Sequence, residues 1–257
     1  MLNNKSNPPP GNRVSSQSVQ TPNERNNHSR LNGILNALSD AELDHVAPKL
    51  RPFDLKVGDV LYEPDDDIEH VYFPTSGVVS LLAAFADGTT VEAGVIGTEG
   101  MAGTPIVLGA KSTPHQALVQ IKGQALRMSA RDLKAEAEKD GVLVKGMLRY
   151  TNAMFVQVAQ TAACNRLHSV EQRLARWLLL SHDRVVGDEF ELTQEFMSRM
   201  LGVRRAGVSV AANQLREMGA IDYRRANVSI LDRQILERSS CECYQIVKAE
   251  YDRNLKT

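Results

Sequence analysis

Arginines and short polar side chains gather in one stretch of the chain, where they could contact a phosphate backbone and the edges of bases. Residues 199–225 hold six Arg and two acidic residues, a net charge of +4. Arg204 and Arg205 lead this stretch, and Ser209 and Asn213 follow at helical spacing. A guanidinium can donate two parallel hydrogen bonds to one guanine, which discriminates between bases by about 1–3 kcal/mol. The pattern therefore favours recognition of double-stranded DNA.

The surrounding sequence predicts the helices that would position these side chains. Thr193 can cap a first helix whose inward side chains are Phe196, Met197, Met200 and Leu201. Gly202 supplies a turn with positive φ. A second helix starts near Arg204, with an inward face of Val208, Ala211, Ala212 and Leu215. This is the pattern of a helix-turn-helix, whose second helix fits the major groove.

A small β-hairpin is predicted after the second helix. Residues 221–223 and 228–231 are strand-like, and the segment 224–227 between them is basic. Its arginines suit phosphate contacts, which position a protein without reading sequence; the alternative is a solvated charged face. The full set of predicted DNA-contacting residues is Thr193, Gln194, Arg204, Arg205, Ser209, Asn213, Arg224 and Arg225.

Upstream, the pattern changes from β to helical. Short strand-like runs with Gly, Pro or Asp between them fill residues 51–128 and predict a β-sandwich or jelly roll. From Arg131 to about His182 the period is helical, with a stripe of Leu143, Met147, Tyr150, Met154, Val158 and Ala162. Such a stripe packs on its own domain or pairs with a second subunit; pairing is favoured, because one small domain could hardly cover so long a face.

The order β-roll, long helix and winged helix-turn-helix resembles the Crp/Fnr family of bacterial transcription regulators. The resemblance covers about Leu38 to Leu236, and the segment from Cys164 to Leu179 is similar to the helix after the family's dimerisation helix. It implies a cytoplasmic homodimer on a palindromic operator, with RNA polymerase as a further partner and an effector domain that controls the recognition helices. The fold class is α+β, in five segments: a disordered tail (1–30), a cyclic-nucleotide-binding-like β-roll (31–130), a dimerisation helix (131–165), a winged helix-turn-helix (166–236) and a C-terminal extension (237–257).

The sequence departs from the cyclic-AMP-binding members of that family. Their binding cassette needs an Arg for the phosphate and a carboxylate for the ribose. Here His115 and Gln116 stand where Arg and Ser/Thr would be, and Glu99 lies too far upstream. Cyclic AMP is therefore not the expected effector, and the small-molecule effector is unknown. A degenerate pocket of Glu99, Lys111, His115 and Gln116 is predicted, with a plain surface loop as the alternative.

The recognition helix differs as well. The family's Arg-Glu-x-x-x-Arg set is matched at Arg205 only, because Ala206 replaces the Glu and Val210 replaces the second Arg. A different operator is expected.

The three cysteines predict neither a metal nor a cofactor. Cys164 lies on a predicted helix and reads as a small buried residue, and no cysteine precedes it, as the family's iron–sulfur branch would need. Cys241 and Cys243 form a C-x-C without nearby histidines, and two thiols cannot complete a tetrahedral site alone. A redox role is the alternative. An odd, small number of cysteines fits a reducing compartment.

Composition narrows the function classes. Residues 41–100 carry twelve acidic and three basic residues, so the overall charge of −1 conceals an acidic β-part and a basic C-terminal part. The sequence contains no run of 18 apolar residues, so a membrane span is not expected. The sequence contains no P-loop, G-x-S-x-G or H-E-x-x-H motif, so it does not suggest an enzyme. The glycine-rich segment from Gly94 to Gly100 falls among predicted strands, whereas a phosphate-binding loop leads into a helix. The remaining alternative to a DNA-binding regulator is a ligand- or partner-binding module whose winged helix contacts protein.

Overall fold

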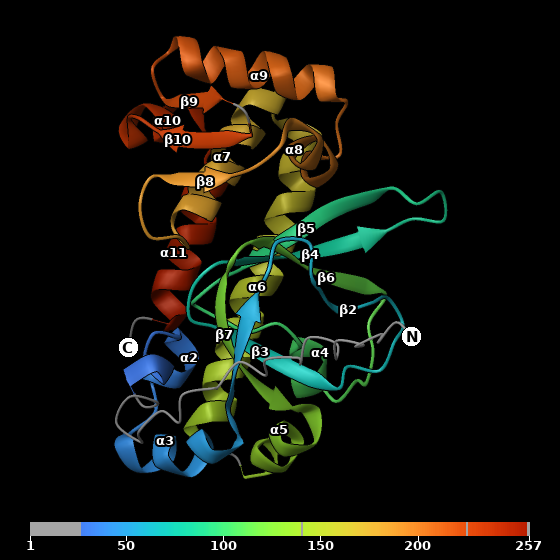
Figure 1. Cartoon of the computed structure of the whole chain (residues 1–257), viewed down its shortest axis with the longest axis vertical. Helices are drawn as coiled ribbons and strands as arrows, with labels where there is room; N and C mark the ends of the chain where they lie inside the picture. Colours follow the sequence, from blue (N-terminus) through green and yellow to red (C-terminus); the bar gives the residue numbers. More distant parts are fainter. Residues whose placement is uncertain (1–26, 140, 225, 256–257) are drawn as a thin grey trace, which may run out of the picture.

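A computed structural model of the chain describes residues 27–139, 141–224 and 226–255. A β-roll forms the lower part of the molecule, a winged helical domain forms the upper part, and one long helix runs between them (Figure 1). The first 26 residues of the predicted tail lie outside the described part. Residues 28 and 30, which the prediction included in that tail, contact the fold: His28 Nε2 lies 3.1 Å from Thr75 Oγ1, and Arg30 pairs with Asp40.

The β-roll is built from two antiparallel sheets, as the sequence predicted. One has the order β1-β7-β3 and the other β2-β6-β4-β5. Buried side chains from both sheets belong to one hydrophobic cluster, which continues into the winged domain. The strands are β1 (Arg51–Leu55), β2 (Val60–Tyr62), β3 (His70–Pro74), β4 (Val78–Ala84), β5 (Thr90–Ile96), β6 (His115–Ile121) and β7 (Gly123–Ser129).

Short helices close the ends of the roll. Ser39 and Glu42 have the spacing of a capping box, and this capping box is present and opens α3. Asn32 is fully buried and caps α2, while its amide donates to the carbonyls of Pro74 (2.9 Å) and Gly100 (2.8 Å). This one side chain thus ties the N-terminal helices to two loops of the roll. The helices are α2 (Gly33–Asn36), α3 (Asp40–Val46), the 3-10 turn Ala47–Lys49, α4 (Thr104–Val107) and α5 (Ala130–Ala137).

The prediction of one continuous helix from Arg131 was wrong. The chain forms α5 and then a separate helix, α6 (Val142–Leu167). Gly141 caps α6 in an extended conformation (ψ −177°) and interrupts the helical path. Glycine weakens a helix interior, and a 3.6-residue period alone does not report such a break.

The apolar stripe predicted to pair subunits lies mostly inside this chain. Leu143, Met147, Tyr150 and Met154 of α6 are buried in the core of the same molecule, while Ala162 is exposed. The stripe therefore serves the alternative use, packing on its own domain. A different face of α6 is exposed, with Leu148 and Phe155 on it.

Three glycines explain how closely α6 and its neighbours approach strand β5 and the loop after it. A Cβ on Gly94 would meet Gln157 of α6, one on Gly97 would meet Arg184, and one on Gly100 would overlap the ring of Tyr150. The weak glycine-rich pattern in the sequence therefore reflects tight packing against side chains.

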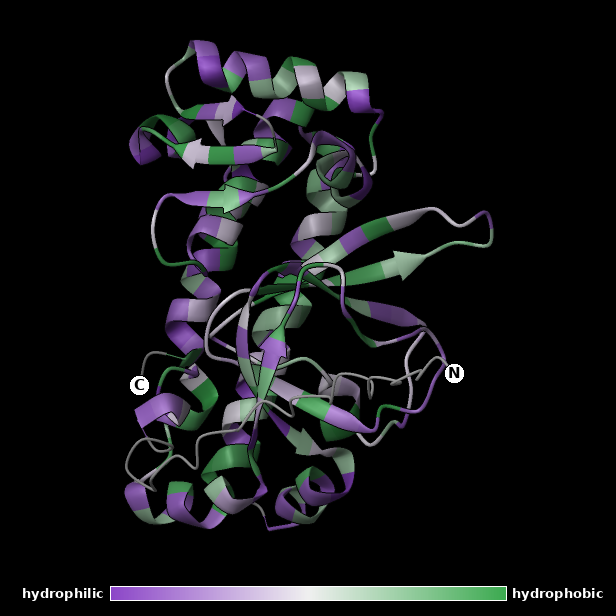
Figure 2. Ribbon diagram, viewed as in Figure 1, coloured by the Kyte–Doolittle hydropathy of each residue, from purple (hydrophilic) through white to green (hydrophobic). Residues whose placement is uncertain are grey.

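The winged domain begins with α7 (Val170–His182), which Ser169 and Gln172 open with a capping box. It continues through β8 (Glu189–Glu191), α8 (Gln194–Leu201), α9 (Arg205–Glu217), β9 (Ile221–Arg224) and β10 (Asn227–Ile230). Two further helices, α10 (Arg233–Ser239) and α11 (Cys243–Leu255), follow, and α11 returns along α6. Hydrophilic and hydrophobic residues are mixed along these helices (Figure 2). Within the described residues, no helix is long and apolar enough to cross a membrane.

We predict that Gly100→Ala destabilises the protein by about 1–3 kcal/mol, because the fully buried Tyr150 ring has no free space to move into. Thermal or urea unfolding of the two proteins measures the difference. Gly207→Ala is the matched control: nothing lies within 4 Å of that added Cβ, and Gly207 is inside α9, so a small stabilisation is expected. Equal stability of Gly100→Ala and wild type would contradict the packing argument.

Candidate nucleic-acid interface and the domain contact beneath it

The helix-turn-helix has the geometry that its sequence predicted. Thr193 accepts a hydrogen bond from the Phe196 backbone N–H (3.0 Å) and caps α8. Gly202 ends α8 in the left-handed conformation (φ 60°, ψ 39°). The predicted inward side chains Met197, Met200, Leu201, Val208, Ala211, Ala212 and Leu215 are buried, whereas Phe196 is only half-buried. Helix α9 is thereby fixed on α7 and α8, with its other face outward.

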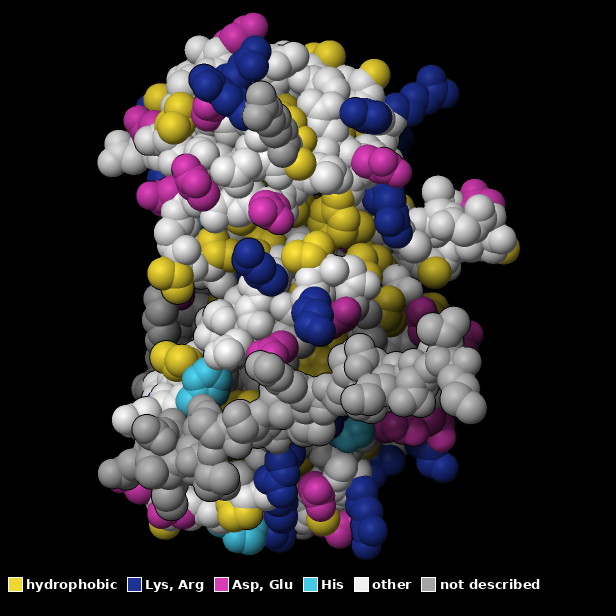
Figure 3. All heavy atoms as spheres, in the orientation of Figure 1, with side chains coloured by type: hydrophobic (Ala, Val, Ile, Leu, Met, Phe, Trp, Pro, Cys, Tyr) yellow, Lys and Arg dark blue, Asp and Glu magenta, His cyan; other side chains and the backbone are white. Residues whose placement is uncertain are grey.

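The outward face of α9 carries most of the predicted base-reading residues. Arg204, Arg205 and Asn213 are exposed, at the first turn and two turns on. Val210, which stands where the family has its second arginine, is 60% exposed on the same helix, and its methyl groups suit contact with a thymine methyl group. Basic side chains lie around the outer end of the winged domain in the space-filling view (Figure 3).

Two of the predicted contact residues already bond to each other. Ser209 Oγ donates to Gln194 Oε1 (2.9 Å), with the Arg205 carbonyl as a second acceptor at 3.1 Å. This bond connects α8 and α9. Ser209 and Gln194 therefore hold the two helices together in this structure, whichever bases or phosphates they also reach.

The predicted wing is present as the sheet β8-β10-β9, in which β8 is a strand that the sequence did not reveal. Arg224 is exposed and forms a 2.8 Å ion pair with Asp222. Arg225 lies outside the described residues.

The four residues of the predicted effector pocket have different partners. Arg184 binds Glu99 at 2.8 Å through both Nε and Nη2, and the Gly97 N–H donates to the same carboxylate oxygen at 3.1 Å. Gln116 donates to Glu63 (2.6 Å), and His115 lies 3.1 Å from the Thr113 hydroxyl. The backbone carbonyl of Lys111 accepts from the Ile68 N–H. Glu99 is thus paired with Arg184, just after α7, whereas Lys111 precedes β6 and His115 and Gln116 begin it.

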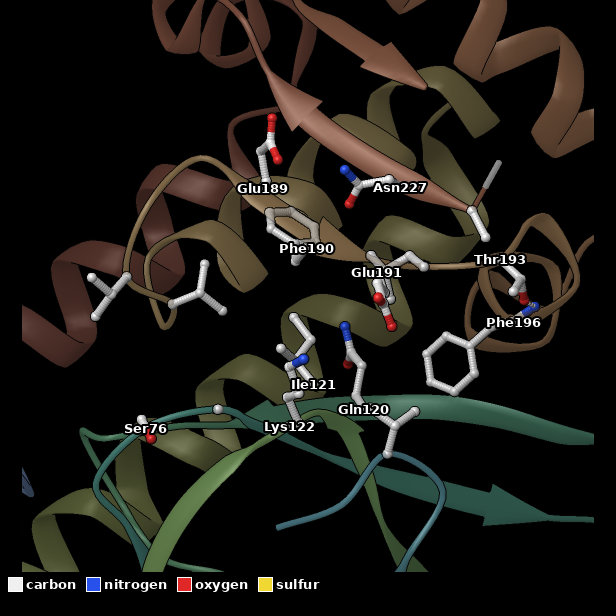
Figure 4. A pocket seen from close by; sticks show the side chains of 16 residues that line it. Ser76, Gln120, Ile121, Lys122, Glu189, Phe190, Glu191, Thr193, Phe196 and Asn227 are labelled. Atoms are coloured by element: carbon white, nitrogen blue, oxygen red, sulfur yellow. Dashed lines mark hydrogen bonds between the residues drawn. The ribbon is translucent and has the colours of Figure 1, made fainter. Parts of the chain in front are cut away.

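A groove of about 940 Å³ separates the roll from the winged domain. Its lower wall includes Ser76, Gln120, Ile121 and Lys122, and its upper wall includes Glu189, Phe190, Glu191, Thr193, Phe196 and Asn227 (Figure 4). The α8 cap at Thr193 therefore lies on the border between the two domains.

Beside this groove, a chain of buried polar side chains crosses from the roll to α7. Trp177 Nε1 donates to Glu92 Oε1 (2.8 Å), and Gln120 Nε2 donates to Ser181 Oγ (3.1 Å). Ser80 Oγ lies 2.7 Å from Glu92 Oε2 and 2.8 Å from Gln120 Oε1. Three strands, β4, β5 and β6, are in this way bonded to the first helix of the winged domain.

With Gln120 Oε1 towards Ser80 and Nε2 towards Ser181, as in this structure, the chain of bonds is complete only when Glu92 carries a proton. A hydroxyl has a single hydrogen, so Ser80 cannot donate to both Glu92 and Gln120. A protonated Glu92 donates to Ser80, which then donates to Gln120. Burial raises the pKa of Glu92 to about 7, although hydrogen bonds from Ser80 and Trp177 and the charge of Arg176 oppose this rise.

The prediction that the cysteines have no histidine partner was wrong. The ligand atoms of Cys164, His168, Cys241 and Cys243 all lie within 4.8 Å of one another. Cys164 and His168 stand one turn apart at the end of α6, and the C-x-C pair precedes and begins α11. A hydrogen bond between the Cys164 and Cys241 thiols lowers the pKa of Cys164 and raises that of Cys241. Cys164 and Cys241 lie 77 positions apart in the sequence, so only the return of α11 along α6 brings the two halves of the cluster together.

Two family models match the two halves of this architecture. Residues 52–140 match the cyclic nucleotide-binding domain, and residues 172–239 match the Crp-like helix-turn-helix domain. Together these segments span more than half of the chain. The protein belongs to the Crp/Fnr family of transcription regulators, which is not an enzyme class. No curated protein sequence matches the chain.

Solved structures share the fold. FixK2 from Bradyrhizobium japonicum is 18% identical with a TM-score of 0.64, over 75% of this chain and 98% of FixK2. CLP from Xanthomonas campestris, a c-di-GMP responsive global regulator, is 14% identical with a TM-score of 0.58, over 76% and 100%. A CooA mutant from Carboxydothermus hydrogenoformans is 18% identical with a TM-score of 0.57, over 81% and 94%. These likenesses confirm the predicted α+β fold class.

We predict that stability falls as the pH rises towards 7 because of Glu92. Its folded pKa is about 7, whereas a carboxyl in an unfolded chain ionises near pH 4.3. Between these values the native state keeps a proton that the unfolded state has lost, so the free energy of unfolding decreases by up to about 3 kcal/mol and then levels off.

Urea unfolding of Glu92→Gln and wild type from pH 5 to pH 8 measures this contribution. Glutamine keeps a donor towards Ser80 and does not ionise, so the variant should gain stability relative to wild type as the pH rises. Glu69→Gln removes an exposed carboxylate beside β3, in the other sheet of the roll, and is the control. A difference between Glu92→Gln and wild type that stays constant across this pH range would refute the prediction.

Proposed function

We propose that this Crp/Fnr-type regulator acts as a homodimer that reads a palindromic DNA operator through α9. The observation that carries the proposal is the exposure of Arg204, Arg205 and Asn213 on one helix whose opposite face is locked into the winged domain. Side chains at the start of a recognition helix reach base edges in the major groove. Arg224 at the wing would contact a phosphate beside the major groove of the DNA.

The dimer would form through the exposed face of α6. Leu148, Phe155, Ala159 and Ala162 are exposed at spacings of seven, four and three residues, as in the seam of a coiled coil. Phe155 is 72% exposed, and a stripe of exposed apolar side chains marks an interaction surface. Pairing there would leave the buried face of α6 in its own roll.

The effector is not expected to be cyclic AMP. No arginine stands at His115 or Gln116, and both side chains have local partners, while Glu99 is held by Arg184. A signal would act instead by shifting the population of domain arrangements, because the contact of α7 with the roll links effector domain and recognition helix. RNA polymerase as a partner and a cytoplasmic location follow from this proposed role.

Arg205→Ala should abolish sequence preference while leaving general DNA binding. Loss of a bidentate contact removes about 1–3 kcal/mol of discrimination in each half-site. The operator is first selected from a random duplex library with purified protein, where half-sites one helical turn or a multiple apart are expected. Binding to that operator and to a scrambled duplex is then compared at several salt concentrations.

Arg238→Ala removes an equivalent exposed charge from α10 and is the control for that experiment. Unchanged preference in Arg205→Ala would sink the proposed reading mode. Binding that does not weaken with salt would instead support the alternative, a module that contacts protein, because neutralised phosphates release counterions.

Phe155→Asp should convert the dimer to a monomer, because it places a charge at the centre of the exposed apolar face of α6. Sedimentation or light scattering reports the mass, and operator affinity should fall with it. Val186→Asp, which charges a side chain that is 98% exposed outside α6, should stay dimeric. A dimeric Phe155→Asp protein would place the interface elsewhere.

A further inference from the structure

All three cysteines of the chain and one histidine converge where the long helix ends. Cys164 Sγ lies 3.5 Å from Cys241 Sγ, and Cys243 Sγ lies 3.6 Å from His168 Nδ1. The thiols form a buried cluster separate from the main hydrophobic core, and the imidazole is 15% exposed. This cluster joins the α6–α7 junction to the segment between α10 and α11.

The spacing of the four ligand atoms fits one tetrahedral ion. With metal–sulfur bonds of about 2.3 Å and metal–nitrogen bonds of about 2.0 Å, ligand atoms of a tetrahedral zinc site lie about 3.5–3.8 Å apart. The Cys164–Cys241 and Cys243–His168 distances fall in or at the edge of this range, and no ligand pair is more than 4.8 Å apart. An iron–sulfur cluster distributes its four ligands over at least two iron atoms, so ligands on different irons lie farther apart than ligands of a single ion.

Outer groups orient the imidazole and one thiol. His168 Nε2 lies 3.3 Å from the Glu242 carboxylate, while Nδ1 faces the thiols. A metal-bound histidine usually donates its other N–H to a carboxylate in this way. The Gln160 amide donates to Cys243 Sγ at 3.2 Å.

Charge beside the cluster is also accounted for by a bound ion. Arg173 and Arg176 of α7 are buried, and both interact electrostatically with Cys164. Within the described part of the chain, neither forms an ion pair with a carboxylate. Buried charges are costly without an opposite charge. Three thiolates, a neutral imidazole and a divalent cation leave one net negative charge next to these guanidinium groups.

We propose that Cys164, His168, Cys241 and Cys243 bind one Zn²⁺ per chain, as a structural site that staples α11 to the domain junction. Binding releases the three thiol protons to solvent, and no redox step is involved. A closed set of three thiolates and one imidazole is typical of structural zinc.

The far end of α11 shows what the staple would hold. Glu250 accepts from Asn152 of α6 (3.0 Å), and Tyr251 lies beside Tyr150 with ring centroids 6.2 Å apart. The Arg184 guanidinium, which pairs with Glu99, lies 5.5 Å from the centre of the Tyr251 ring. Helix α11 thus spans from the cluster to the roll, so zinc would fix the winged domain relative to the effector domain.

The decisive measurement is the metal content of the full-length protein, purified in reducing buffer, together with Co²⁺ titration after chelation. We expect one zinc per chain and, with Co²⁺, the visible and near-ultraviolet bands of tetrahedral thiolate coordination. Added Zn²⁺ should raise the Tm of the chelated protein and protect all three thiols from alkylation.

Variants separate coordination from folding. Cys243→Ser should lose the metal, whereas His168→Cys should keep it as a four-thiolate site with a shifted Co²⁺ spectrum. Glu242→Gln should weaken zinc affinity by about 10–100-fold in competition with a chelator. His45→Gln, an exposed histidine of α3, is the control with unchanged metal content. Arg205→Ala should keep its zinc, so that failure of the DNA proposal and of this one are distinguishable.

Wild-type protein alone can overturn the proposal. Less than one Zn²⁺ bound at saturation, an octahedral Co²⁺ spectrum, or a Cys164–Cys241 disulfide in the protein as purified would each do so. The last result would assign the cluster to redox chemistry.

Discussion

Helix α6 carries two apolar faces, and both must be covered. The arrangement of the rest of the molecule depends on this constraint. One face fills the core of the roll with large side chains such as Tyr150 and Met147. The opposite face keeps Phe155 and Leu148 exposed. Because both faces are apolar, the helix can be covered completely only if something outside this chain packs on it. The burial of the first face also fixes the direction in which the helix delivers the winged domain.

The contact between roll and winged domain contains buried polar side chains beside the hydrophobic cluster that runs through both domains. Glu92, Ser80, Gln120, Trp177 and Ser181 form a hydrogen-bonded chain across it, and Glu99 pairs with Arg184 nearby. Buried networks of this kind are strong when every member is satisfied and weak when one is not. A contact whose completeness depends on a single proton can hold two domains in register and release them at a modest energetic cost. The adjoining groove leaves room for such a rearrangement.

The C-terminal helix adds a second connection between the same two domains. It starts at the thiol–imidazole cluster and ends against Tyr150 and Arg184, so the recognition helix is linked to the roll both through α7 and through α11. An ion at the cluster would make the second connection rigid. The position of α9 would then depend on the state of the roll and on occupancy of the cluster, which are physically separate inputs.

Much of this protein follows from local sequence signals. Helix caps and helix faces depend on neighbours a few residues away, so capping rules and periodicity can predict them. Examples are the capping boxes at Ser39 and Ser169, the Thr193 cap, the left-handed Gly202 and the buried faces of α8 and α9. The exposed arginines of α9 follow from the same periodicity. The break at Gly141, the third wing strand and the side of α6 that is buried were not predicted, because each depends on which surfaces meet. The clearest case is His168: its sequence neighbours include no second ligand beyond Cys164, and only tertiary packing of α11 on α6 places Cys241 and Cys243 around it. Sequence determined the elements and their faces, whereas contacts between residues far apart in the chain decided which side chains share a site.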